Sequence, residues 1–106
     1  MIVYNKLIRD RIPEIMEAAG KTFEIRTLKD DEYGEKLDEK LSEELHEYLQ
    51  AKGKDKVEEL ADLVEVVYAI LDQKGVSIQE FESCRKAKRE KRGGFKEKLY
   101  LLNVNE

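Results

Sequence analysis

Residues 60–71 read LADLVEVVYAIL, and ten of these twelve residues are apolar. The helix that this stretch predicts has apolar side chains on nearly every side, and such a helix is buried on most sides. Asp55 and Glu58 form an acidic version of the capping box. We therefore expect the helix to start near Asp55 and to run to Lys74, before Gly75 ends it.

A second long helix is predicted immediately before the first one. Apolar residues recur three or four positions apart between Leu37 and Leu49, which is the spacing of one helical face. Asp30 can cap this helix, which then runs to about Ala51. Only a few residues around Gly53 separate the two helices, so we expect them to be antiparallel neighbours.

Shorter elements flank this pair. Residues 10–19 predict a first helix, and Ser77 with Glu80 forms a capping box that starts a last helix ending near Arg92. Residues 22–28 and 98–104 have the pattern of short strands. The expected fold is mainly α: an antiparallel bundle of about four helices with two short β segments.

Length and composition limit the class of protein. The chain has 106 residues, so we expect residues 1–106 to form a single domain. Charged residues make up 42% and hydrophobic residues 41%, enough for a folded chain. The absence of a long apolar run or a signal-peptide pattern favours a cytoplasmic protein with no membrane partner. Too few helices are present to cover residues 60–71, so we expect another subunit to complete the core, in a homodimer or homotetramer.

Acidic residues lie at matching places on the two long helices. Glu44 and Glu47 are three residues apart, and so are Glu59 and Asp62, so each pair shares a helix face. Antiparallel packing would let the two pairs face each other across one groove. Buried acids are costly unless they are paired or bind a metal, and Mg²⁺ takes oxygen ligands of this kind. The alternative is that these are ordinary surface acids of an acid-rich chain.

The acids also support a resemblance to a known family. Glu43-Glu44-x-x-Glu47 followed by Glu59-x-x-Asp62 resembles the signature of the MazG-like all-α nucleoside triphosphate pyrophosphohydrolases. The stretches YNKLIRDRIP (residues 4–13) and KRGGF (residues 91–95) resemble the phosphoribosyl-ATP pyrophosphohydrolase-like branch.

The resemblance implies an enzyme that cleaves between the α- and β-phosphates of a nucleotide and releases a monophosphate and pyrophosphate. It implies Mg²⁺ as the cofactor, with Mn²⁺ as the alternative, and again a dimer or tetramer. The metal ligands that it implies are Glu44, Glu47, Glu59 and Asp62. Glu43 matches an acid of variable role, which we interpret as a group that orients water or supports the ligands. The candidate catalytic residues are therefore Glu43, Glu44, Glu47, Glu59 and Asp62.

Basic residues gather toward the ends of the chain. Residues 30–65 have a net charge of -9, whereas residues 84–98 have a net charge of +6. Basic residues near these ends are candidates for binding substrate phosphates, although charge compensation at a helix end explains the C-terminal group equally well. These candidates are Lys6, Arg9, Lys88, Arg89, Lys91 and Arg92.

The alternative function is a helical nucleic-acid-binding module that uses residues 85–98. The acidic balance of the whole protein, with a pI near 5.2, makes nucleic acid an unfavoured partner. Three other residues that attract attention receive ordinary assignments. We expect Cys84 to be a buried apolar group and Phe95 to pack in the core, and we exclude His46 as a ligand because it lies off the direction shared by Glu44 and Glu47.

Overall fold

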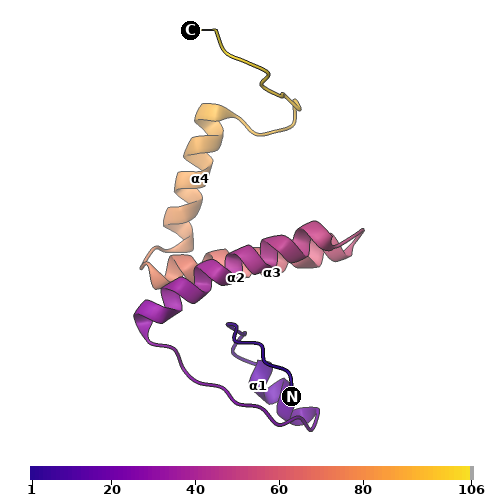
Figure 1. Ribbon diagram of the computed structural model, residues 1–106. Coiled ribbons are helices and arrows are strands. Elements are labelled where there is room, and N and C mark those ends of the chain that lie inside the picture. The colour runs from indigo at the N-terminus through magenta and orange to yellow at the C-terminus, as the bar shows by residue number, and fades with distance from the viewer. Residues whose placement is uncertain (106) are drawn as a thin grey trace.

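The centre of the molecule is an antiparallel pair of long helices, α2 (Asp30–Gln50) and α3 (Asp55–Gln73), which lie side by side along most of their length (Figure 1). The computed structural model describes residues 1–105. Leu37 is 2% exposed and Val66 is 8% exposed, so the best-buried apolar contacts of the described chain lie between these two helices. The predicted pair of antiparallel neighbours is confirmed.

The connection between α2 and α3 is as short as the sequence predicted. It comprises residues 51–54, and Gly53 has a φ of 58°, a left-handed conformation that glycine adopts without a steric penalty. Asp30 and Asp55 are the first residues of their helices and not the residues before them. No side-chain cap hydrogen bond is present at the start of α3, so the predicted capping box of Asp55 and Glu58 is wrong. Both acids still lie at the positive end of a helix dipole, which favours a negative charge.

The two outer helices also form where the sequence predicted them. Helix α1 (Ile12–Ala18) ends before Gly20, and α4 (Ile78–Arg92) ends at Gly93. The hydroxyl oxygen of Ser77 accepts a hydrogen bond from the Glu80 backbone N–H at 3.1 Å. This bond satisfies a backbone donor that has no partner inside the first turn. The predicted cap of α4 is therefore confirmed.

The structure corrects the prediction of two short β segments. Residues 22–28 and 98–104 are neither helical nor paired as strands, and the described part of the chain has helices as its only regular secondary structure. A strand needs a neighbour that accepts and donates its backbone hydrogen bonds. The C-terminal segment projects away from the helices in Figure 1, where no other segment lies beside it. A strand-like sequence pattern is therefore not enough to form a strand in these two segments.

Residues 22–28 are held near the start of α2 by side chains instead. The guanidinium of Arg26 donates to both oxygens of Glu32, at 3.1 and 2.8 Å. These bonds, together with a backbone N–H bond from Lys29, lower the pKa of the Glu32 carboxyl to about 2. A bidentate ion pair thus fixes the extended segment to the first turn of α2.

The described chain has an open shape. Its radius of gyration is 18.3 Å, whereas a compact chain of about 100 residues has a radius near 13 Å. Helix α4 contacts only one end of α3 and extends away from the α2–α3 pair, while α1 lies on the other side of that pair (Figure 1). Four helices are present as predicted, but extensive helix packing within the described residues is limited to α2 and α3.

Two residues that we expected in the core are exposed. Cys84 is exposed on α4, and Phe95 is 97% exposed after the end of that helix. Both expectations assumed that α4 would pack along the bundle, and its divergence from α2 and α3 removes that cover. His46 is exposed, which agrees with its exclusion as a ligand. Among residues 1–105, no helix is both long enough and apolar enough to cross a bilayer.

Candidate active site

The acidic side chains of α2 and α3 form two overlapping groups. One oxygen from each of Glu43, Glu44 and Glu47 lies within 4.8 Å of the others, and the same is true of Glu44, Glu59 and Asp62. The first group comes from one face of α2, because residues three and four apart are neighbours on a helix. The second group joins both helices. The five acids are therefore brought together around Glu44.

Glu44 has the least favourable environment for a negative charge in this cluster. Its residue is only 6% exposed, and its Oε2 atom is buried with no hydrogen-bond partner. Burial raises the pKa of the Glu44 carboxyl above its usual range, and the negative charge of Glu47 raises it further. Lys40 opposes these effects, since its Nζ atom lies 3.4 Å from Glu44 Oε1.

Glu59 presents a second buried oxygen toward the pair of helices. Its Oε2 atom, like that of Glu44, has no hydrogen-bond partner among the described residues. Buried carboxylate oxygens without partners are costly, and a divalent cation compensates such a cost directly. Mg²⁺ binds carboxylate oxygens and keeps water in its remaining positions. The donor atoms at this site therefore fit a hard divalent cation.

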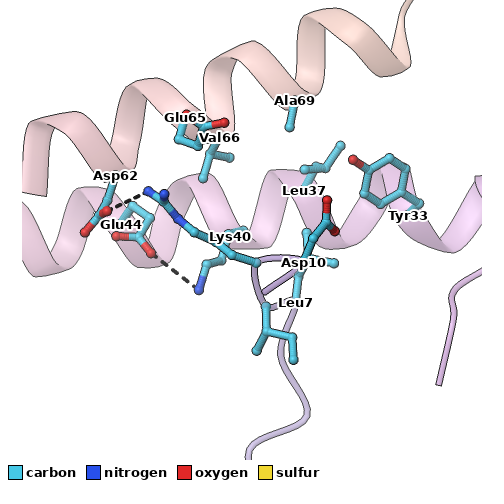
Figure 2. A pocket seen from close by; sticks show the side chains of 12 residues that line it. Leu7, Asp10, Tyr33, Leu37, Lys40, Glu44, Asp62, Glu65, Val66 and Ala69 are labelled. Atoms are coloured by element: carbon cyan, nitrogen blue, oxygen red, sulfur yellow. Dashed lines mark hydrogen bonds and ion pairs between the residues drawn. The ribbon is translucent and has the colours of Figure 1, made fainter. Parts of the chain in front are cut away.

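The N-terminal segment brings two positive charges to the same acids. Arg9 Nη2 lies 2.7 Å from Asp62 Oδ1, and Lys6 Nζ lies 3.4 Å from Glu43 Oε1. Figure 2 shows the ion pair of Asp62 beside that of Lys40 and Glu44. Lys6 and Arg9 were predicted to bind phosphate. In the structure both residues lie in the segment that precedes α1, and both form ion pairs with the acids.

A cavity of about 230 Å³ lies between this segment and the two helices. Pockets that enclose a small-molecule ligand usually measure about 300–1,000 Å³. The cavity of one chain is therefore smaller than most such pockets. Residues 7–10, Lys40, Glu44, Asp62 and Val66 contribute to its lining (Figure 2).

Lys40 is a site residue that the sequence analysis missed. It pairs with both Glu43 and Glu44, at 3.4 Å in each case, and it also lines the cavity. The signal was present in the sequence, because Lys40 precedes Glu44 by four residues and therefore shares its face of α2.

The four basic candidates of α4 are not at the acid cluster. Lys88, Arg89, Lys91 and Arg92 are exposed near the end of α4 that projects away from α2 and α3 (Figure 1). Within one chain they cannot act on a group held by Glu44 and its neighbours. Their predicted role in substrate binding therefore receives no support from the arrangement of a single chain.

The described residues form an all-α fold in which two antiparallel helices share a cluster of carboxylates. The chain belongs to the phosphoribosyl-ATP pyrophosphohydrolase family, whose family model matches residues 3–89. The match includes the N-terminal motif and all five acids, and it ends before residues 91–95. The resemblance found in the sequence is thereby confirmed at the level of the family.

An uncharacterized protein of Mycolicibacterium smegmatis is 54% identical to this chain over 50 residues. The aligned part is 47% of this chain and 51% of that protein, so the chain spans about half the length of this curated relative. No solved structure matches the chain.

Proposed function

We propose that this protein is a Mg²⁺-dependent nucleotide pyrophosphohydrolase. It would cleave the phosphoanhydride between the α- and β-phosphates of a nucleoside triphosphate or a related nucleotide, giving a monophosphate and pyrophosphate. The observation that carries this proposal is the buried Glu44 carboxylate, which lies within 4.8 Å of Glu59 and Asp62 on the neighbouring helix. Family membership supports the same reaction class.

Glu44, Glu47, Glu59 and Asp62 are the proposed metal ligands, with Mn²⁺ as an alternative to Mg²⁺. A bound divalent cation supplies charge neutralisation at the phosphate oxygens and lowers the pKa of a coordinated water. The two acid groups share Glu44, so this residue would hold the ligands from α2 and α3 in one place. The proposed domain that carries the site is the whole chain, residues 1–106.

The remaining acid and the nearby bases have separate proposed roles. Glu43 is half-buried and accepts hydrogen bonds from Lys6 and Lys40, so its carboxylate is held beside the cluster. We assign Glu43 the task of orienting the attacking water. Lys6, Arg9 and Lys40 supply positive charge next to the groove, where they would bind the anionic phosphates of the substrate.

The protein is also proposed to act as a homodimer or homotetramer. Leu60 and Val64 of α3 and Leu49 of α2 are exposed, and the chain is far more open than a compact monomer. A second copy that covers these faces would complete the core. The basic residues of α4 would then bind substrate at the site of another copy. These residues are Lys88, Arg89, Lys91 and Arg92.

The test is a substrate screen of the full chain with Mg²⁺ or Mn²⁺. Pyrophosphate release is measured from nucleoside triphosphates, diphosphates and phosphoribosyl-ATP, for the wild type, Glu59→Gln and Glu58→Gln. We expect Glu59→Gln to lose at least about a hundredfold in kcat/KM, because a ligand is removed. Glu58 is exposed and lies outside both acid groups, so Glu58→Gln is the matched control and should retain wild-type activity. Equal activity of the wild type and Glu59→Gln, or no activity on any nucleotide, would contradict the proposal.

A second candidate function is nucleic-acid binding by residues 85–98. The observation that favours it is the exposed basic end of α4, which extends away from the acids. The acidic balance of the whole protein counts against it. Salt-dependent binding of a labelled RNA or DNA without any metal would support this function, and absence of binding at low salt would exclude it.

A further inference from the structure

We infer that the Arg9 guanidinium holds the Asp62 carboxylate in the metal-free protein and competes with a divalent cation for it. Arg9 is thus a positioning residue that competes with the metal for one of its ligands. The inference rests on the proposed metal site. It adds that the Arg9 contact lowers the affinity of this site for the metal, which the proposed reaction does not require.

The first support is the unusual reach of this contact. The ion pairs of Arg11, Arg26 and Arg85 join residues that are close in the sequence. Arg9 and Asp62 are 53 residues apart, and Lys6 and Glu43 are 37 residues apart. Among the ion pairs of residues 1–105, these two are the long-range ones, and both end on the acid cluster. The N-terminal segment therefore contacts α2 through Glu43 and contacts α3 through Asp62, which is a candidate metal ligand.

The second support is the charge of the cluster. Glu44, Glu59 and Asp62 hold their oxygens within 4.8 Å of one another, an arrangement in which like charges repel. Lys40 compensates Glu44, and Arg9 compensates Asp62 through a short contact of 2.7 Å. A guanidinium and a divalent cation that share one carboxylate repel each other, so each weakens the binding of the other. Binding of the metal by Asp62 therefore opposes the Arg9 contact.

The third support is the exposure of the pair. The side chain of Arg9 is 55% exposed and that of Asp62 is 42% exposed. An exposed ion pair contributes little free energy, so a cation that gains several ligands at once can replace it. The competition is reciprocal: if the metal weakens the Arg9 contact, the Arg9 contact weakens metal binding by the same factor.

Direct metal titration of the full chain tests the inference without relying on activity. Free Mn²⁺ is measured by electron paramagnetic resonance for the wild type, Arg9→Gln and Arg11→Gln. We expect Arg9→Gln to bind Mn²⁺ about two- to fivefold more tightly, the range that an exposed ion pair supports. Arg11→Gln is the matched control, because it removes the same charge two residues further along the chain, from a side chain that pairs locally with Glu14. It should bind like the wild type.

A second measurement follows the wild-type protein, so its result does not depend on the stability of a variant. The Arg9 side-chain Nε–Hε signal is assigned by its loss in Arg9→Gln, and the signal is followed by NMR as Mg²⁺ is added. We expect it to shift as the guanidinium leaves Asp62, while the Arg11 signal stays in place.

The outcomes separate this inference from the proposed function. If the wild type and Arg9→Gln bind Mn²⁺ equally, or Arg9→Gln binds it more weakly, and Asp62→Asn weakens binding, the metal site stands and the competition is overturned. If none of the proteins binds Mn²⁺, the proposed metal site and the competition are both overturned. Tighter binding in both arginine variants would show a general charge effect and would also overturn the inference.

Discussion

Glu44 is the residue at which burial and negative charge oppose each other most strongly. It is 6% exposed, one of its oxygens has no hydrogen-bond partner, and it belongs to both acid groups. Its raised pKa means that the folded chain binds a proton at Glu44 more readily than the unfolded chain. Without metal, the free energy of unfolding therefore falls as the pH rises from the ordinary pKa of a glutamate to the raised pKa of Glu44. Above the raised pKa, the folded protein keeps this loss of stability.

Glu44→Gln is accordingly expected to stabilise the metal-free protein at pH 7, by about 1 kcal/mol, because it removes a buried charge while retaining a similar shape. The same variant should lose the stabilisation that Mg²⁺ gives to the wild type. Thermal unfolding is measured in a chelator and in Mg²⁺, with Glu97→Gln, at an exposed position outside the helices, as the control. A metal-free Glu44→Gln protein that is less stable than the wild type would contradict this expectation.

The sequence predicted the positions of the acids better than those of the bases. Helix periodicity fixes which residues share a face, so the pairs formed by Glu44 with Glu47 and by Glu59 with Asp62 could be inferred from residue spacing alone. The contact of Arg9 with Asp62 could not, because Arg9 precedes α1 in a segment without periodic structure. Where such a segment lies depends on tertiary contacts alone.

At the scale of the elements, α2 and α3 were predictable because their signals agree. The apolar stripe of α2, the apolar stretch of α3 and the glycine between them all indicate one antiparallel pair. The strands were not predictable in the same way, since a strand depends on a partner that the local sequence does not specify. The direction of α4 was equally unpredictable, because a cap such as Ser77 determines where a helix starts and not what it packs against.

The α2–α3 pair depends on a small buried interface, in which Leu37 is the best-buried side chain. We expect Leu37→Ala to destabilise the protein by about 2–5 kcal/mol, through lost apolar burial and the cavity that remains. Urea unfolding followed by circular dichroism measures the change. Leu99→Ala, in the exposed C-terminal segment, is the control and should change the unfolding free energy by less than about 0.5 kcal/mol. Similar losses in both variants would show that Leu37 has no special part in the pair.

At the scale of the whole molecule, the chain leaves many of its large apolar side chains uncovered. Leu37 and Val66 are the apolar residues that the described chain buries, whereas many large apolar side chains on α2, α3 and the two ends are exposed. Monomeric proteins rarely leave extended apolar patches in water. The sequence predicted this shortage of cover from the length of the chain and the apolar stretch of α3, but it did not specify which faces would remain open.

We therefore expect sedimentation at micromolar concentration to give a mass at least twice 12.4 kDa. Leu49→Asp, which places a charge on an exposed apolar position of α2, should shift the distribution toward monomer. Gln50→Asp, at the neighbouring exposed position, is the control and should sediment like the wild type. A wild-type protein that sediments as a 12.4 kDa monomer would contradict the proposed assembly.

The exposed thiol on α4 has a practical consequence for such measurements. Cys84 is the single cysteine of the sequence, so a maleimide dye attaches at one defined point outside the acid cluster. The labelling rate then reports the accessibility of α4. A rate that slows as the protein is concentrated would indicate that neighbouring copies shield this helix, and a constant rate would indicate that α4 stays in water.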